Sequence, residues 1–160
     1  MYRLNIKEPL VLFGLIGFCL LVGMIGGIST SQQIETWYQI LNKPSWTPPN
    51  CIFAPIWTIL YIIMGISVWL IFRKRDVYST KSAFLFFVFQ LLLNAAWSHL
   101  FFGMQNPFAG FIDILVLWVA ILATIKSFLK VSKLAAVLMI PYFVWVSYAT
   151  CLNYSIWRMN

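Results

Sequence analysis

The sequence CIFAPIWTILYIIMGISVWLIF, residues 51–72, contains no charged side chain. A transmembrane helix needs roughly 20 consecutive, mostly apolar residues, and this segment has that length and character. Four more segments share both properties and occupy residues 9–29, 82–102, 107–128 and 134–157. The sequence therefore predicts an all-α integral membrane protein, a bundle of five transmembrane helices that forms a single membrane domain over residues 1–160.

The composition points to the same class. Hydrophobic residues make up 62% of the chain and charged residues 9%, and the mean hydropathy is +0.87. Soluble proteins carry charges at about 25% of their positions, so this chain has too few to cover a water-exposed surface. The first segment is longer than the apolar region of a signal peptide and lacks a small-x-small cleavage site, so we expect it to be retained as a helix.

The net charge of +7 is distributed unevenly between the two sides of the predicted bundle. Only Lys43 and Arg158 fall on the side of the C-terminus. All other basic residues fall on the side of the N-terminus: Arg3, Lys7, Arg73, Lys74, Arg75, Lys81, Lys126, Lys130 and Lys133. The positive-inside rule then places the N-terminus inside and the C-terminus outside. We interpret the charge as a topology signal and expect no nucleic-acid partner.

The segment that joins the first two helices, residues 30–50, is the longest connection and lies outside in this topology. Its stretch IETWYQIL places Ile34, Trp37, Tyr38 and Leu41 at helical spacing, which predicts a short amphipathic helix. The following KPSWTPP excludes regular helix, because each proline fixes φ and removes a backbone donor. Such a stiff, aromatic segment is either an anchor at the membrane interface or a lid over a site.

Polar and aromatic side chains gather in the outer half of the predicted bundle. At a rise of about 1.5 Å per residue, they lie about 6 to 18 Å below the outer ends of their helices. The residues concerned are Trp57, Asn94, Trp97, Asp113, Trp145, Ala149 and Asn153. Polar groups in a bilayer normally face the bundle interior, since facing lipid costs a few kcal/mol each. The pattern therefore predicts a cavity in the outer half, beneath the long segment.

Two of these polar residues each allow two interpretations. Asp113 is either a carboxylate near a helix start, where exposed amide dipoles stabilise it, or part of the cavity wall. Asn94 is either an interhelical packing contact or a hydrogen-bond donor to a ligand.

Other patterns suggest packing rather than chemistry. Phe53, Trp57 and Tyr61 recur every four residues and form one aromatic face. Gly23 and Gly27 form a small-xxx-small pair that suits close helix contact. We expect Pro141 to kink or break the fifth helix. We expect no metal site, because the single histidine, His99, and the cysteines share no ligand spacing: Cys19, Cys51 and Cys151.

Several of these stretches together resemble the translocator protein family, also called tryptophan-rich sensory proteins (TspO/MBR) or peripheral benzodiazepine receptors. The resemblance runs from the first loop to the C-terminus and rests on WY (37–38), LNKPSWTPP (41–49), PIWTILYIIMG (55–65), QLLLNAAW (90–97), FFG (101–103) and PYFVWVSYATCLNY (141–154). It implies a multi-pass protein of a bacterial cell membrane, often a homodimer. It also implies a receptor or binding protein for porphyrins and for isoquinoline or benzodiazepine-type drugs.

The resemblance also implies which residues form the ligand-binding cavity. They are Tyr38, Pro44, Trp46, Phe53, Trp57, Asn94, Trp97, Asp113, Trp145, Ala149 and Leu152. The stretch Leu152-x-Tyr154-x-x-x-Arg158 matches a permissive sterol motif, and we interpret it as helix packing with an interfacial arginine.

A porphyrin fits this residue set chemically. Indoles stack on its flat faces, and the Asn94 amide with the Trp57 and Trp145 N–H groups can donate to its carboxylates. No axial ligand is evident, so we expect free-base porphyrin to bind as a ligand without a required cofactor. Alternatives are a light-dependent porphyrin-degrading enzyme, with Trp57 and Trp145 as oxidisable catalytic candidates, and a porphyrin or sterol transporter. No acid–base pair, nucleophile triad or internal repeat supports a conventional enzyme or transporter.

Overall fold

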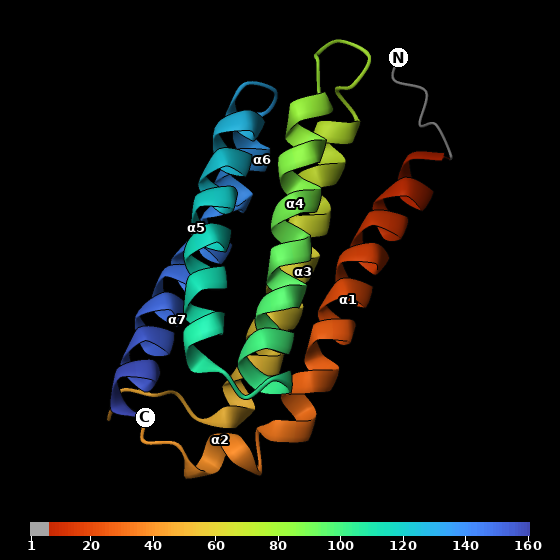
Figure 1. The fold of residues 1–160 in the computed structure, drawn as a ribbon. Helices are drawn as coiled ribbons and strands as arrows, with labels where there is room; N and C mark the ends of the chain where they lie inside the picture. Colours follow the sequence, from red (N-terminus) through yellow and green to blue (C-terminus); the bar gives the residue numbers. More distant parts are fainter. Residues whose placement is uncertain (1–6) are drawn as a thin grey trace.

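The computed structural model describes residues 7–160 as a bundle of helices (Figure 1). The helices are α1 (Lys7–Gln33), α2 (Trp37–Ile40), α3 (Asn50–Phe72), α4 (Lys81–Ser98), the π-helix η1 (His99–Gly103), α5 (Pro107–Leu129), α6 (Lys133–Leu138) and α7 (Ile140–Met159). No strand occurs within this range. The predicted basic position Arg3 lies outside the described residues.

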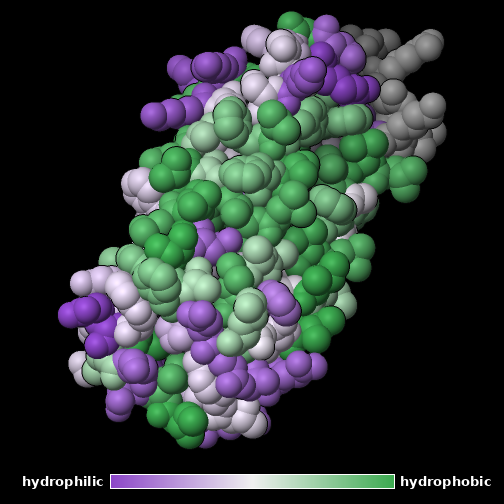
Figure 2. Space-filling model, viewed as in Figure 1, coloured by the Kyte–Doolittle hydropathy of each residue, from purple (hydrophilic) through white to green (hydrophobic). Residues whose placement is uncertain are grey.

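Five helical units in residues 7–160 are long and apolar enough to cross a membrane, which confirms the predicted class. Figure 2 shows an apolar band between two ends that are rich in polar groups. We call the end that carries α2 and the C-terminus the lid end, and the opposite end, with the basic connections after α3 and α5, the basic end (Figure 1). The assignment of the lid end to the outside stays a prediction.

The five spans form a ring in which α1 lies between α3 and α4, and α5 lies between α4 and α7. The ring closes where α3 packs against α6 and α7. Aromatic rings bridge α3 and α7. The Phe53 and Trp145 centroids are 6.1 Å apart, and the Trp57 and Tyr142 centroids are 6.2 Å apart. The bundle therefore has room between its helices toward the lid end.

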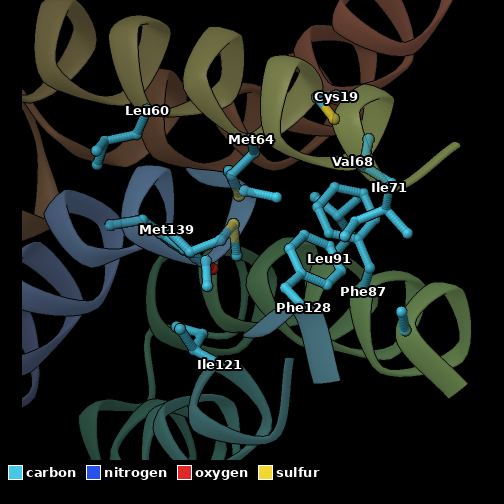
Figure 3. Close-up of a cluster of buried hydrophobic side chains, with 14 of the residues drawn as sticks. Cys19, Leu60, Met64, Val68, Ile71, Phe87, Leu91, Ile121, Phe128 and Met139 are labelled. Carbon is cyan, nitrogen blue, oxygen red and sulfur yellow. The ribbon is translucent and has the colours of Figure 1, made fainter. Parts of the chain in front are cut away.

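The core of the basic half is filled by apolar side chains (Figure 3). Met64, Ile71 and Ile121 are fully inaccessible to solvent. The rings of Phe87 and Phe128 stack with centroids 5.9 Å apart. This filled half anchors the helices that surround the more open half.

The helix ends follow local chemistry. The Asn106 side chain accepts a hydrogen bond from the Ala109 N–H at 3.0 Å, and Pro107 occupies the first helical position of α5, where its missing N–H costs nothing. The last span breaks at Met139, between α6 and α7, as expected from Pro141, whose ring crowds the preceding turn and which has no backbone N–H to donate. A π-helix at residues 99–103, which the sequence did not predict, ends the third span.

One span boundary differs from its predicted position by more than two residues. α1 continues to Gln33 rather than ending near residue 29, so the connecting segment is residues 34–49. The predicted amphipathic helix in it is a single turn, α2. Pro55 lies inside α3, where it has no N–H to donate to the Cys51 carbonyl.

Close contact between α1 and α3 depends on glycine. A Cβ atom on Gly65 would lie 2.6 Å from the Cα of Ile16, a backbone atom that cannot rotate away. A Cβ on Gly23 would overlap the Tyr61 ring. Because association in lipid relies on packing rather than the hydrophobic effect, these contacts fix how near the two helices approach.

We expect Gly65→Ala to lower the free energy of unfolding by about 1–3 kcal/mol, because its methyl group must push α1 away. The measurement is the denaturation midpoint of the detergent-purified protein. Gly17→Ala is the matched control, since a Cβ there meets nothing within 4 Å. Equal midpoints for the two variants would show that the α1–α3 distance is not set by Gly65.

Candidate functional site

A cavity of about 650 Å³ occupies the half of the bundle nearer the lid end. Its walls come from α1, α3, α4 and α7, and α2 and η1 close it at the lid end. No residue of α5 is among those that line it. The volume of the cavity falls within the roughly 300–1,000 Å³ of typical small-molecule sites.

Eight of the predicted ligand-binding residues line this cavity: Tyr38, Phe53, Trp57, Asn94, Trp97, Trp145, Ala149 and Leu152. The other three do not. Pro44 and Trp46 lie in the connecting segment, residues 34–49, which we call the lid segment, and are not among the lining residues. Asp113 is buried within α5, with 9% of its surface exposed. The Asp113 Oδ2 atom has no hydrogen-bond partner among the described residues.

The floor of the cavity is a chain of three side chains from three helices. The Tyr61 hydroxyl donates to Asn94 Oδ1, and Asn94 Nδ2 donates to the Tyr142 hydroxyl at 2.9 Å. All three residues are buried. The Asn94 amide is therefore occupied mainly by protein partners, which favours the packing interpretation of this residue over the role of principal ligand donor.

A second polar pair also satisfies itself. Trp97 Nε1 donates to Asn153 Oδ1 at 2.9 Å, and Asn153 Nδ2 donates to the Pro107 carbonyl at 2.8 Å. Trp97 also stacks on Phe101, with centroids 5.3 Å apart and ring planes 20° from parallel. Trp97 thus offers a ligand its flat face rather than its N–H group.

Trp145 differs from these residues. Its Nε1 atom is buried and has no acceptor among the described residues. Its ring lies between Phe53, at 6.1 Å, and Tyr148, on which it stacks at 5.6 Å. A buried donor without an acceptor is costly, and a ligand oxygen in the cavity would relieve that cost.

The remaining wall is aromatic. The Trp57 ring lies 5.7 Å from that of Tyr61, tilted by 30°. It also meets Tyr142 edge-on at 6.2 Å. Such surfaces favour a flat π-system, which can stack on some rings and meet the edges of others.

The lid segment is fastened at several points. The Tyr148 hydroxyl donates to the Trp46 carbonyl at 2.8 Å, and the Trp46 and Tyr148 rings meet edge-on. Asn42 N–H donates to Asn160 Oδ1 at 2.9 Å, and Asn160 Nδ2 donates to the Asn42 carbonyl at 3.0 Å. Trp46 is 45% exposed, and neither Trp46 nor Tyr148 is among the residues that line the cavity.

The underside of the lid is held by Tyr38, which is 3% exposed and packs against Phe101 and Phe102. Burial, with a smaller contribution from Tyr148, raises the pKa of Tyr38 to about 12. Its hydroxyl is therefore neutral at physiological pH. Lys43 Nζ donates to the Tyr38 carbonyl at 2.6 Å and lies 4.7 Å from the ring centroid, which holds the end of α2 in place.

Two parts of the wall were missed from the sequence. The first span contributes Gly23, Met24 and Gly27, and η1 contributes Phe101 and Phe102. The glycine pair was interpreted only as a packing motif, although glycine also leaves space beside a helix. Nothing in the sequence signalled that the π-helix would direct two phenylalanines to the lid.

Among residues 7–160, no three His, Cys, Asp or Glu side chains are placed to hold a metal ion. The expectation that no cofactor is required stays a prediction.

The chain is similar in sequence to known proteins over most of its length. The family model described as TspO/MBR family matches residues 15–158. A tryptophan-rich protein TspO of Chlorobaculum tepidum is 42% identical over 96% of this chain and 98% of its own length. A protein of the same name from Archaeoglobus fulgidus is 40% identical over 88% of this chain and 91% of its own. The human translocator protein is 37% identical over 78% of this chain and 75% of its own.

We expect Asn94→Leu to destabilise the protein, because two buried tyrosine hydroxyls lose a partner and each unsatisfied group costs about 1–3 kcal/mol. Tyr142→Phe removes one of those hydroxyls. The denaturation midpoints of the wild type, both single variants and the double variant form a cycle, and we expect a coupling energy of about 0.5–3 kcal/mol. Strict additivity would mean that the Asn94–Tyr142 bond contributes nothing to the fold.

Proposed function

The chain belongs to the TspO/MBR family, and on that premise we propose that it is a membrane receptor that binds porphyrins and flat, drug-like aromatic molecules in the lidded cavity. The unpaired Trp145 N–H, buried in an aromatic wall, is the observation that carries this proposal. It favours a ligand that combines a π-surface with an oxygen acceptor. A porphyrin carboxylate and a drug carbonyl both meet that requirement.

The different roles of the polar residues support the same ligand class. Asn94, Tyr61 and Trp97 direct their hydrogen bonds to other side chains. The polar groups of these three residues are therefore committed to the fold, whereas the Trp145 N–H has no acceptor among the described residues. Stacking on Trp57 and Trp97 adds on the order of 0.5–1.5 kcal/mol for each aromatic contact beyond area burial.

A light-dependent porphyrin-degrading enzyme is the second candidate, because Trp57 and Trp145 both line the cavity. A photoexcited porphyrin held there would lie against two oxidisable indoles. In that case protein-bound porphyrin bleaches under illumination faster than free porphyrin, and replacing both indoles by Phe slows the bleaching without abolishing binding in the dark. Bleaching that is unchanged in the double variant would remove these indoles from the chemistry.

The proposal also covers the membrane in which the protein lies, its orientation there and its oligomeric state. We place it in a bacterial plasma membrane with its lid end outside, consistent with the basic residues at the opposite end. A homodimer is part of this proposal, and a nucleic-acid partner is not. Relatives carry the name translocator protein, so saturable, gradient-dependent porphyrin uptake by vesicles would favour transport instead.

The test of the receptor function is titration of the detergent-purified protein with protoporphyrin in the dark, followed by tryptophan quenching. We expect saturable quenching and about a tenfold loss of affinity in Trp145→Phe, since one hydrogen bond to a carboxylate contributes about 1.4 kcal/mol or more. Trp69→Phe is the matched control: its Nε1 is also buried and unpaired among the described residues, but it lies outside the cavity. Equal losses of affinity in both variants would contradict a specific role for Trp145. Absence of saturable quenching would exclude protoporphyrin as a ligand.

A further inference from the structure

We infer that the cavity opens sideways into the hydrocarbon of the lid-end leaflet, through a mouth between α1 and α3, and that its ligand is an amphiphile that enters from the lipid. This inference deepens the proposed function and rests on it for the identity of the ligand. The mouth is formed by two neighbouring helices, α1 and α3.

Six of the residues that line the cavity on these two helices are also exposed to solvent. On α1 they are Met24, Gly27 and Ser31, and on α3 they are Cys51, Ala54 and Thr58. Met24 alone is 66% exposed. A side chain that lines a cavity and is also exposed marks the rim of an opening. This rim therefore runs along both helices.

The rim lies at the depth of the lipid tails. Met24 is nine residues from the end of α1 at Gln33, and Thr58 is eight from the start of α3 at Asn50. At about 1.5 Å per residue, both lie roughly 12–14 Å from the lid end of their helices. The hydrocarbon core of a bilayer is about 30 Å thick, so the lower rim faces acyl chains rather than water.

The chemistry of the rim suits that surrounding. The Thr58 hydroxyl donates to the Ala54 carbonyl at 2.9 Å, and the Ser31 hydroxyl donates to the Ile28 carbonyl at 3.0 Å. Both hydroxyls are satisfied within their own helix, so the rim beside Met24 and Thr58 presents mainly CH₂ and methyl groups. Lipid tails can approach such a surface without leaving a polar group unpaired. Glu35 and Asn50, which also line the cavity and are exposed, lie at the lid end of the rim.

The opening ends toward the basic end of the bundle. There, Gly23 contacts the Tyr61 ring, and Gly65 contacts the backbone of Ile16 so closely that a Cβ would not fit. The two helices are thus sealed in the basic half. Beside the cavity, the position of Gly27 is open, and a Cβ there would meet nothing within 4 Å.

A second concavity continues the opening outward over α1. It has a volume of about 490 Å³ and is lined by Leu21, Met24, Ile25, Gly27, Ile28 and Ser31. It shares Met24, Gly27 and Ser31 with the cavity, so the two spaces meet across the glycine. This shallow groove gives a ligand in the surrounding lipid an apolar surface that leads to the mouth.

The alternative route, across the lid, is obstructed. A ligand passing there must break the Asn42–Asn160 pair and the bond from Tyr148 to Trp46. At the mouth, the hydroxyls of Ser31 and Thr58 bond within their own helices and do not bridge α1 to α3. The lateral route is therefore the less costly one.

The first experiment tests the mouth without any porphyrin. The protein is reconstituted with phosphatidylcholine that carries a photoreactive diazirine in mid-chain, and adducts are mapped by mass spectrometry. We expect adducts inside the cavity at Trp57 or Tyr61, in addition to adducts at the lipid-facing Ile59. Adducts confined to Ile59 and other outward side chains would overturn the proposal.

Two bulky variants narrow the mouth, and each has a matched control on its own helix. Gly27→Phe fills open space at the rim of α1, whereas Gly17→Phe fills open space on α1 away from the cavity. Ala54→Phe and the exposed Ile59→Phe form the corresponding pair on α3. We expect the adducts at Trp57 and Tyr61 to disappear in the rim variants and to persist in the controls. Their persistence in both rim variants would contradict the mouth.

Binding kinetics in proteoliposomes test the route of the ligand. We expect the rim variants to slow the association of protoporphyrin by about tenfold relative to their matched controls, because a narrowed mouth restricts entry of the ligand. Unchanged association in both rim variants would overturn the lateral route even if wild-type binding is intact. Wild-type protein that gives internal lipid adducts but binds no porphyrin would refute the proposed ligand and leave the mouth supported.

Discussion

The bundle depends on one constraint that a membrane imposes: a polar group at mid-depth must find its partner inside the protein. The Asn94 amide meets this constraint by joining the hydroxyls of Tyr61 and Tyr142, and so links α4 to α3 and α7. Between these hydrogen-bonded side chains and the basic end, apolar side chains fill the space (Figure 3). Toward the lid end, aromatic rings bridge α3 and α7, and a cavity remains between the helices.

Much of this arrangement could be predicted from the sequence, because bilayer thickness fixes the length of an apolar helix. The five spans follow from uncharged runs such as residues 51–72, and the break in the last span follows from Pro141. The gathering of Trp57, Trp97 and Trp145 around one space also followed, since their depths were comparable. The depth of a residue along its helix does not determine which way its side chain points, however. Asp113, at a similar depth, lies outside that space.

The features that could not be predicted depend on pairwise contacts. Whether Asn94 serves a ligand or the fold was open until its partners on two other helices were known. The part played by α1 was missed for the same reason: Gly23 and Gly27 lie in one motif, yet the first packs against a ring and the second borders open space. A spacing rule cannot separate these two environments, because the difference lies in the neighbouring helix.

The length of α1 has a consequence for how the protein responds to its membrane. Its 27 residues extend about 40 Å at 1.5 Å per residue, and its apolar part, residues 9–29, covers about 30 Å, the thickness of a typical hydrocarbon core. In a thinner bilayer this apolar part exceeds the hydrocarbon core, and the helix tilts to relieve the hydrophobic mismatch at a modest cost. Because α1 is pinned to α3 at its glycine contacts, tilting pivots it there and changes its separation from α3 toward the lid end. Bilayer thickness, and with it lipid composition, thereby becomes a physical variable that acts on the shape of the site.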